Sequence, residues 1–326
     1  MPRFLRPAAV APAAAVAIGL FAAAPAAGDE PVVSSPHVIA HFDLAAGQTP
    51  ENVVTERGGS VDVTFASARQ VAKVTRERRV RVLATLPAED HPRTSLMDGA
   101  VTLGLARAHD GTLYVNYATG TGRTGVWRVP AGGGTPEQIA QLPSDGLPNG
   151  LALDERHGVL YAADSALGTV WRIPQAGGTP TAWATGTALT GLPAPASGFG
   201  ANGIKVHQDA VWVTNSDRGT LLRIPVGADG SAGATETRAT GLTGVDDFVF
   251  PGHSDVVLAA LNPSNEVVMV RPDGVRSTVL TVQDGLSNPT SLAVNGRDLF
   301  VAGGAYSTQR DPNLLKARLR AHFARS

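Results

Sequence analysis

Four oxygen-bearing side chains occupy equivalent positions of a repeated sequence pattern. Successive copies of the pattern lie 52, 46, 53, 44 and 44 residues apart and align at Glu51, Leu103, Asn149, Asn202, Asp246 and Thr290. Four of these six positions hold a carboxylate or a carboxamide, where a neutral structural position would favour Val, Ser or Ala. Hard oxygen ligands in this number suit Ca²⁺, with water completing its six to eight ligands. No histidine falls on the aligned positions, which disfavours zinc.

A turn is the simpler interpretation of part of this pattern. Asn149-Gly150 and Asn202-Gly203 are common turn dipeptides. Glu51 and Asp246 occupy the same position without a following glycine, which favours a metal site over a turn. Two carboxylates that converge inside a channel repel each other unless a cation, a proton or solvent lies between them.

The elements that position these residues are short apolar strands separated by polar turns. Residues 148–153 run through a turn at 156–158 into 159–162 and then 169–174, and the scheme recurs later in the chain. A unit of three to four strands repeated about every 48 residues is typical of a propeller blade. Six copies predict an all-β, six-bladed β-propeller with antiparallel blades. The alternative is a two-sheet sandwich whose strands resemble one another by accident.

The two ends of the chain have their own signatures. Residues 1–27 combine a basic start, an apolar stretch and a small-residue cleavage site, which predicts a secretory signal peptide. A membrane anchor is the alternative, and the short, alanine-rich stretch disfavours it. We therefore expect a secreted protein, extracellular or periplasmic, with no membrane attachment after cleavage.

The remaining boundaries follow from the repeat. We expect a linker at 28–36, the propeller at 37–312 and a short basic helical tail at 313–326. The largely apolar segment 37–44 can add a strand to the last blade and close the ring, which removes free sheet edges.

Composition excludes several function classes. With 27 Lys+Arg against 28 Asp+Glu, the formal net charge is −1, which gives no electrostatic reason to expect nucleic acid or an anionic membrane as partner. The absence of Cys rules out disulfides, thiolate zinc sites and a cysteine nucleophile. We expect a monomer that acts on a small-molecule substrate.

A family resemblance rests on four of the aligned motifs. They are Pro50-Glu51-Asn52, Pro148-Asn149-Gly150-Leu151, Ala201-Asn202-Gly203-Ile204 and Val245-Asp246-Asp247. In their blade order they resemble the metal-ring motifs of the gluconolactonase/regucalcin-like six-bladed propellers, and more distantly those of the paraoxonase-like propellers. The resemblance covers nearly all of residues 37–305.

The resemblance implies roles for particular residues. In that family a Glu of the first blade, two Asn of middle blades and an Asp of a later blade hold calcium or another divalent ion. Position by position, this implicates Glu51, Asn149, Asn202 and Asp246 as metal ligands. The later-blade Asp is also thought to act as a base there, which makes Asp246 the expected catalytic residue and its neighbour Asp247 a second candidate.

Some family features are missing. Leu147 and Gly150 stand where relatives that act on sugar lactones carry a basic residue and an Asp, so a sugar lactone is not the expected substrate. The histidine pair of the paraoxonase-like branch has no counterpart, because the repeat places no histidine of the mature chain at a channel position. Trp127 and Trp171 occupy equivalent third-strand positions and are expected in the core between blades.

Three functions remain open. The first is a metal-dependent hydrolase of a lactone or similar ester, in which the ion polarises the carbonyl and Asp246, Asp247 or the metal activates water. The second is a ligand- or protein-binding propeller with a structural calcium. The third is a non-hydrolytic enzyme that resembles strictosidine synthase. The fold alone does not choose among them; a charged, metal-competent channel favours an enzyme, and the missing substrate-clamping residues favour binding.

Overall fold

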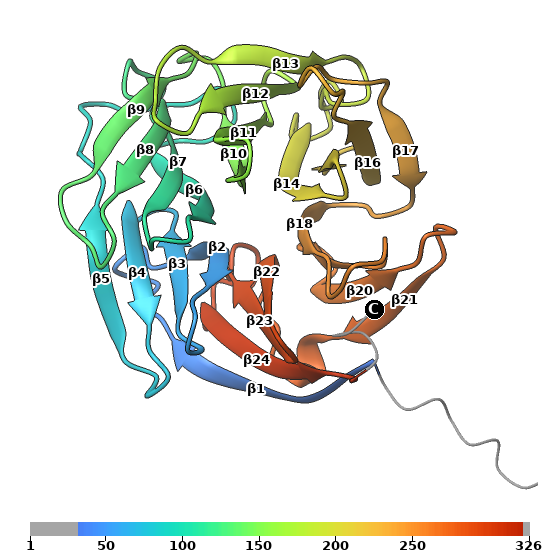
Figure 1. Cartoon of the computed structure of the whole chain (residues 1–326). Helices are drawn as coiled ribbons and strands as arrows, with labels where there is room; N and C mark the ends of the chain where they lie inside the picture. The colour runs from blue at the N-terminus through green and yellow to red at the C-terminus, as the bar shows by residue number, and fades with distance from the viewer. Residues whose placement is uncertain (1–31, 322–326) are drawn as a thin grey trace, which may run out of the picture. The chain divides into compact units, whose positions relative to one another are not determined.

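The computed structural model describes residues 32–321, which form a ring of six β-sheets (Figure 1). Each sheet contains four strands that pair in antiparallel fashion. The six-bladed β-propeller predicted from the repeat is therefore confirmed. Besides strands, the described residues contain one short 3₁₀ turn, η1 (Val282–Asp284). None of their helical segments is long and apolar enough to cross a membrane.

The first five blades follow the chain, and each runs from its innermost to its outermost strand. Their strands are β2 (Pro50–Thr55), β3 (Val61–Phe65), β4 (Gln70–Val74) and β5 (Val80–Thr85) in blade 1; β6 (Val101–Arg107), β7 (Leu113–Ala118), β8 (Gly125–Val129) and β9 (Glu137–Gln141) in blade 2; β10 (Pro148–Asp154), β11 (Val159–Asp164), β12 (Thr169–Pro174) and β13 (Thr181–Thr185) in blade 3; β14 (Ala201–His207), β15 (Ala210–Asn215), β16 (Thr220–Pro225) and β17 (Glu236–Ala239) in blade 4; and β18 (Val245–Val249), β19 (Val257–Leu261), β20 (Glu266–Val270) and β21 (Arg276–Leu280) in blade 5.

The sixth blade joins the two ends of the described chain. It contains β22 (Pro289–Asn295), β23 (Asp298–Gly303), β24 (Asn313–Leu319) and, at its outer edge, β1 (Val33–His41). Strand β1 pairs antiparallel with β24, and Figure 1 shows it lying across the outside of that blade. The expected closure of the ring by an N-terminal strand is confirmed.

The prediction of a helical tail at 313–326 is wrong for its first seven residues. Residues 313–319 form strand β24 rather than a helix. The physical reason is an alternation of period two, in which Leu315, Ala317 and Leu319 are fully buried and the intervening Lys316 and Arg318 are not. Helix-favouring residue types were outweighed by burial of one face of the strand.

The boundaries shift accordingly. Strands of the propeller extend from 33 to 319, beyond the expected limits of 37 and 312, so part of the expected linker at 28–36 belongs to β1. The predicted signal peptide at 1–27 and the final residues 322–326 lie outside the described residues.

Every innermost strand is irregular at the aligned position. The pairing of first and second strands shifts register between Pro50 and Val53, Thr102 and Leu105, Pro148 and Leu151, Ala201 and Ile204, Val245 and Phe248, and Pro289 and Ser291. Irregularities of this kind re-aim side chains that a regular strand would alternate. Asn149-Gly150 and Asn202-Gly203 therefore lie within strands β10 and β14, and the turn interpretation is excluded.

Glycine next to the aligned position lets neighbouring inner strands approach closely. A Cβ on Gly104 would overlap the backbone carbonyl of Asn149, and one on Gly150 would overlap that of Asn202. On Gly203 it would lie 2.6 Å from the Cα of Asp247. None of these three glycines has a positive φ. They are needed for space between blades rather than for an unusual backbone conformation.

Side chains of second strands bind the backbone carbonyls of aligned residues in the next blade. Thr64 Oγ1 donates to the carbonyl of Leu103 at 2.7 Å, and Asn116 Nδ2 donates to that of Asn149 at 2.9 Å. Thr214 Oγ1 donates to the carbonyl of Asp246 at 2.6 Å. Buried backbone carbonyls that a bulge leaves outside the ladder require such partners. Blades 1, 2 and 4 thus each fix the inner strand of the next blade.

Apolar side chains fill the spaces between blades. Trp127 is buried in a cluster that joins blades 1 and 2, and Trp171 packs at the edge of the cluster between blades 2 and 3. Both tryptophans therefore lie in the core between blades, as expected.

We predict that Gly150→Ala destabilises the fold, because the added methyl group has no room against the inner strand of blade 4. Overpacking of this kind costs about 1–3 kcal/mol, which should appear as a lower midpoint in urea or thermal unfolding. Gly122→Ala is the matched control, since the nearest atom to its Cβ would be Gln141 Nε2 at 3.9 Å. Equal stability of the two variants would contradict close packing of the inner strands.

Candidate metal centre

The four predicted metal ligands line one cavity. Glu51, Asn149, Asn202 and Asp246 come from blades 1, 3, 4 and 5, and all four border a cavity of about 320 Å³ where the inner strands begin. Leu103 of blade 2 joins them at its own aligned position. The cavity is completed by Met97, Ser197, Phe199, Ser216, Gly244, Asn262, Pro263 and Tyr306.

Serine side chains hold the two asparagines that line this cavity. Asn149 Nδ2 donates to Ser165 Oγ at 3.2 Å, and Asn202 Nδ2 donates to Ser216 Oγ at 2.8 Å. Each serine hydroxyl donates a hydrogen bond of 2.7 Å to a backbone carbonyl of the next blade, Ser165 to Ala201 and Ser216 to Val245. The serines therefore act as acceptors for the amide groups. The nitrogen of each amide is thus held by a serine, and its oxygen remains available as a ligand.

The two carboxyl groups are buried, and neighbouring negative charges raise the pKa of both. Burial raises the pKa of Glu51 to about 7; a hydrogen bond from Tyr306 opposes the rise, and the charge of Asp247 adds to it. Burial also raises the pKa of Asp246 well above its usual range, and the charges of Glu51 and Asp247 raise it further. Without a cation, the ionised forms of both groups are disfavoured.

Hydrogen bonds orient these carboxylates unequally. The Tyr306 hydroxyl donates to Glu51 Oε2 at 2.5 Å, a short contact typical of a phenol and a carboxylate. Asp246 Oδ2 receives the longer hydrogen bond of Asn262 Nδ2 at 3.3 Å. Glu51 is therefore the more firmly held of the two.

Asp247 occupies a different environment from the one expected for a base. Its carboxylate receives both of its closest contacts from Lys205 Nζ, at 2.6 and 2.7 Å, and further hydrogen bonds from Ser291 Oγ at 2.7 Å and Asn52 Nδ2 at 3.4 Å. Its side chain is 3% exposed and does not line the cavity. The expected catalytic role of Asp247 does not agree with this placement, because its neighbouring cation and donors occupy the carboxylate.

The charge balance of the centre suits a divalent ion. Fully ionised Glu51, Asp246 and Asp247 carry three negative charges, and Lys205 carries one positive charge. The remainder is two negative charges on the cavity side, all on oxygen ligands. Within residues 32–321 no three His, Cys, Asp or Glu side chains gather in a way that could hold a metal. The candidate ligand set depends instead on two carboxylates and two carboxamides.

Sequence reasoning missed several residues of the centre. Ser165 and Ser216 follow the second strands of blades 3 and 4, and Asn262 stands at the same place in blade 5. This recurrence is a signal that the repeat alignment contains. Tyr306 lies in the corresponding connection of blade 6, between β23 and β24, and this connection is longer than those of the other blades. Tyr306 therefore has no equivalent position in the repeat. No histidine lines the cavity, as expected.

One side of the cavity is apolar. Leu103 belongs to a buried cluster with Val101, Ala118 and Leu147, and Met97 and Phe199 pack against it. The carboxylates and Tyr306 come from blades 1, 5 and 6. The cavity therefore combines a charged side with an apolar side.

Comparisons with known proteins agree with this architecture. No protein-family model matches the chain, and no curated protein matches it. Among solved structures, the calcium-binding protein regucalcin from Agrobacterium tumefaciens str. C58 is 16% identical, with 88% of this chain and 96% of that chain covered and a TM-score of 0.63. A putative gluconolactonase is also 16% identical, with 90% and 93% covered and a TM-score of 0.63.

The similar solved structures also include a lyase. Virginiamycin B lyase from Staphylococcus aureus is 16% identical, with 84% of this chain and 82% of that chain covered and a TM-score of 0.55. At such identities the similarity establishes the fold alone. The structural neighbours nevertheless include the gluconolactonase- and regucalcin-like propellers that the sequence motifs resemble.

We predict that Ca²⁺ stabilises the folded protein. A ligand that binds only the folded state raises the melting temperature with the logarithm of its free concentration, once this exceeds the dissociation constant. Calorimetry of chelator-treated protein with added Ca²⁺ measures the shift. Glu51→Gln should reduce it, because one ligand charge is lost, whereas Asp273→Asn in an exposed turn should not. Identical melting curves in chelator and in millimolar Ca²⁺ would exclude the site.

A second prediction concerns pH in the absence of the ion. Because the pKa of Glu51 rises from 4.5 to about 7 on folding, its protonated form stabilises the fold below its ordinary pKa. This contribution is lost as pH rises through about 7. Between these two pH values the melting temperature of chelator-treated wild type should fall relative to that of Glu51→Gln. Parallel pH profiles of the two proteins would show that the Glu51 carboxyl has an ordinary pKa.

Proposed function

We propose that this protein is a secreted hydrolase of lactones or similar esters that depends on a divalent cation, with Ca²⁺ the best-suited ion. The observation that supports the proposal most strongly is the convergence of Glu51, Asn149, Asn202 and Asp246 on one cavity that also has an apolar side. Secretion follows from the predicted signal peptide at residues 1–27.

The four residues fit a calcium site by chemistry and by orientation. All four offer hard oxygen atoms, and the serine contacts engage the amide nitrogens of the two asparagines, which leaves their oxygens available to a cation. A divalent cation bound there supplies Lewis-acid polarisation of a substrate carbonyl. The firm hydrogen bond from Tyr306 holds Glu51 as a ligand rather than as a proton acceptor.

Asp246 is the residue best placed to move a proton. It lines the cavity, and its side-chain donor Asn262 lies at the long distance of 3.3 Å. In the proposed reaction Asp246 accepts a proton from water as the water oxygen bonds to the carbonyl carbon. The ester C–O bond then breaks, and the same proton passes from Asp246 to the departing alkoxide. Water is the only co-reactant.

The apolar side of the cavity indicates the kind of acyl group. Met97, Leu103 and Phe199 would contact an aliphatic or aromatic portion of the substrate. Fully buried Leu147 and the bare backbone of Gly150 offer no polar side chain to sugar hydroxyls. A volume of about 320 Å³ lies at the small end of the range for ligand sites, which suits a small lactone.

The same lack of polar clamps at Leu147 and Gly150 favours a second candidate function. In a ligand- or protein-binding propeller, the ion would serve stability alone. The two functions differ in their response to removal of the Asp246 charge.

We predict that Asp246→Asn lowers turnover of a cation-dependent lactone substrate by roughly a hundredfold or more, because Asn keeps the shape but cannot accept a proton. A panel of aliphatic and aromatic lactones and aryl esters, assayed with and without chelator, measures this loss at saturating Ca²⁺. Thermal melting of the variant with Ca²⁺ serves as the folding control.

Two outcomes would contradict the hydrolase. One is the absence of cation-dependent turnover of any member of the panel by the wild type. The other is an Asp246→Asn variant that melts at a lower temperature but hydrolyses the same esters at the wild-type rate. Either result would support the binding propeller.

A further inference from the structure

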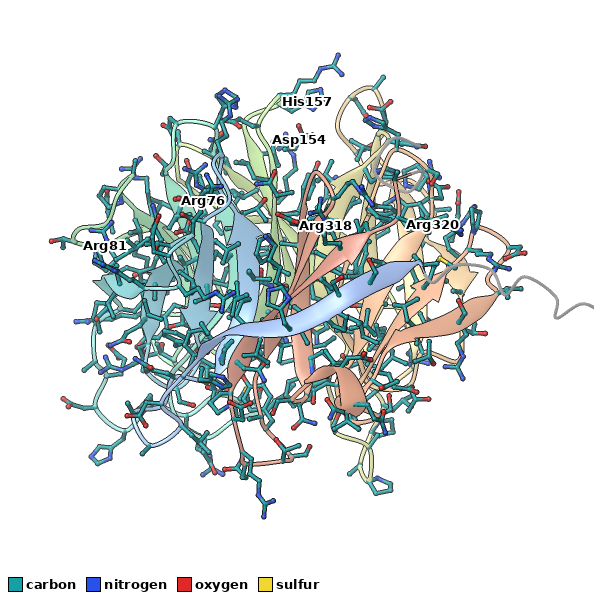
Figure 2. All side chains as sticks on the ribbon, turned by 90° about the horizontal axis from the view of Figure 1, so that it is seen from below. Arg76, Arg81, Asp154, His157, Arg318 and Arg320 are labelled. Atoms are coloured by element: carbon teal, nitrogen blue, oxygen red, sulfur yellow. The ribbon has the colours of Figure 1, made fainter. Side chains whose placement is uncertain are left out.

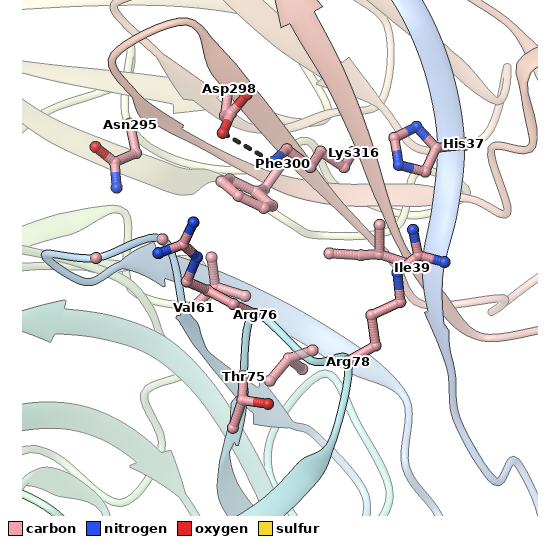
Figure 3. Close-up of a pocket in the computed structure, with 13 residues that line it drawn as sticks. His37, Ile39, Val61, Thr75, Arg76, Arg78, Asn295, Asp298, Phe300 and Lys316 are labelled. Carbon is pink, nitrogen blue, oxygen red and sulfur yellow. Dashed lines mark ion pairs between the residues drawn. The ribbon is translucent and has the colours of Figure 1, made fainter.

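A second cavity, of about 550 Å³, lies where blade 6 meets blade 1. It is lined by residues of β1, of the turn after β2, of the β4–β5 hairpin and of β22 to β24 (Figure 3). We call it the closure pocket, defined by His37, Ile39, Gly58, Gly59, Val61, Val74, Thr75, Arg76, Arg78, Asn295, Asp298, Phe300 and Lys316.

The closure pocket lies at the other end of the blades from the candidate metal centre. In blade 1, Pro50 at the start of the inner strand pairs with Phe65, whereas Thr55 at its end pairs with Val61, and Val61 pairs with Val74. The residues of the closure pocket follow that second end. Figure 2, an edge-on view, shows Arg76 toward the same end of the blades as Asp154, the last residue of β10, and His157 in the turn that follows it. The two cavities are therefore separate.

Two exposed arginines, Arg76 and Arg78, border the closure pocket. Within residues 32–321, neither guanidinium takes part in a salt bridge or a side-chain hydrogen bond, although the charge of Arg76 contributes to lowering the pKa of the exposed Glu77 carboxyl beside it. Other arginines form salt bridges with glutamates. The nitrogen–oxygen distances are 2.9 Å for Arg123, 2.6 Å for Arg128 and 3.2 Å for Arg223. Unpaired guanidinium groups that face one cavity are the usual means of binding an oxyanion.

The third cation of the pocket is already neutralised. Lys316 Nζ pairs with Asp298 Oδ2 at 2.8 Å. Figure 3 shows Arg76 and Arg78 reaching from the β4–β5 hairpin toward blade 6, where the Lys316–Asp298 pair faces them. The four charged side chains that line the pocket leave two positive charges on it; Glu77, between the two arginines in the hairpin, does not line the pocket.

Local structure supports the position of Arg76. Gly59 has a φ of +88°, and a Cβ there would lie 3.8 Å from Cγ, Cδ and Nε of Arg76. The Arg76 side chain therefore runs along the backbone of the turn after β2. This contact directs its guanidinium group along the wall of the pocket rather than into open solvent.

We propose that the closure pocket binds a small phosphate ester, of the size of a sugar phosphate. A phosphate monoester carries a charge of about −1.5 to −2 at neutral pH, which matches the two unpaired arginines. The volume lies within the range of small-molecule sites. The polar side chains of His37, Thr75 and Asn295 offer partners for hydroxyl groups.

The bound ester would join the two ends of the ring. Arg76 and Arg78 belong to blade 1, whereas His37 and Lys316 belong to β1 and β24 of blade 6. A ligand that contacts both sides stabilises the folded state by the free energy of its binding. The proposal is independent of the hydrolase function, since no residue is shared with the candidate metal centre.

Titration calorimetry and thermal melting with three probes test the proposal on the full chain. Glucose 6-phosphate should bind and raise the melting temperature, inorganic phosphate should bind more weakly, and glucose should not bind. Arg76→Gln and Arg78→Gln should each weaken the binding of glucose 6-phosphate about tenfold or more, as expected for loss of a charge-assisted hydrogen bond.

Two variants serve as controls. Arg79→Gln removes the same charge from the same hairpin but does not line the pocket, so binding should change less than twofold. Asp298→Asn removes the carboxylate that neutralises Lys316 and should bind glucose 6-phosphate at least as tightly as wild type.

Three results would overturn the proposal. The first is the absence of binding of glucose 6-phosphate and phosphate at millimolar concentration. The second is an equal loss of binding in Arg76→Gln and Arg79→Gln, which would indicate a diffuse positive field. The third is preferential binding of a long polyanion such as heparin, with equal losses at Arg76, Arg78 and Arg79, which would indicate a surface for macromolecules.

Discussion

The close approach of neighbouring inner strands is the constraint on which this structure depends. Gly104, Gly150 and Gly203 leave no side chain between one blade and the next, and Thr64, Asn116 and Thr214 bind the carbonyls that the irregular strands leave free. Because the irregularity falls at the aligned position of each blade, side chains that are far apart in sequence reach a common cavity. The geometry that closes the propeller is thus the same geometry that gathers Glu51, Asn149, Asn202 and Asp246.

Charge divides the centre into two layers. At the aligned positions, Glu51 and Asp246 face the cavity, and their raised pKa values reflect burial beside other carboxylates without a partner cation. One residue further along, Asp247 is neutralised by Lys205 and held by Ser291 and Asn52. Removing one member of a buried ion pair leaves an uncompensated charge, so this deeper layer contributes to the fold. The outer layer keeps the unsatisfied negative charge that a divalent ion requires.

Much of this arrangement could be predicted from the sequence, because equivalent residues of successive repeats occupy equivalent places in the blades. Alignment of the blades found the ring, the four candidate ligands and the closing strand at the N-terminus. It could not find Tyr306, which lies in the extended connection between β23 and β24 of the last blade, or the Lys205–Asp247 pair, which depends on contact between blades 4 and 5. The helical tail predicted at 313–326 is wrong for residues 313–319, because Leu, Lys, Ala and Arg favour helices locally whereas these residues form a strand. The alternation of Leu315, Ala317 and Leu319 with basic residues was the better guide to its burial.

The most direct test of the central claim is a crystal structure of the protein grown with Ca²⁺. The account predicts one ion in the cavity, with oxygen atoms of Glu51, Asn149, Asn202 and Asp246 at about 2.3–2.6 Å, and with both asparagine amide nitrogens still on Ser165 and Ser216. An empty cavity at saturating Ca²⁺, or an ion bound elsewhere while the asparagine nitrogens face the cavity, would contradict it.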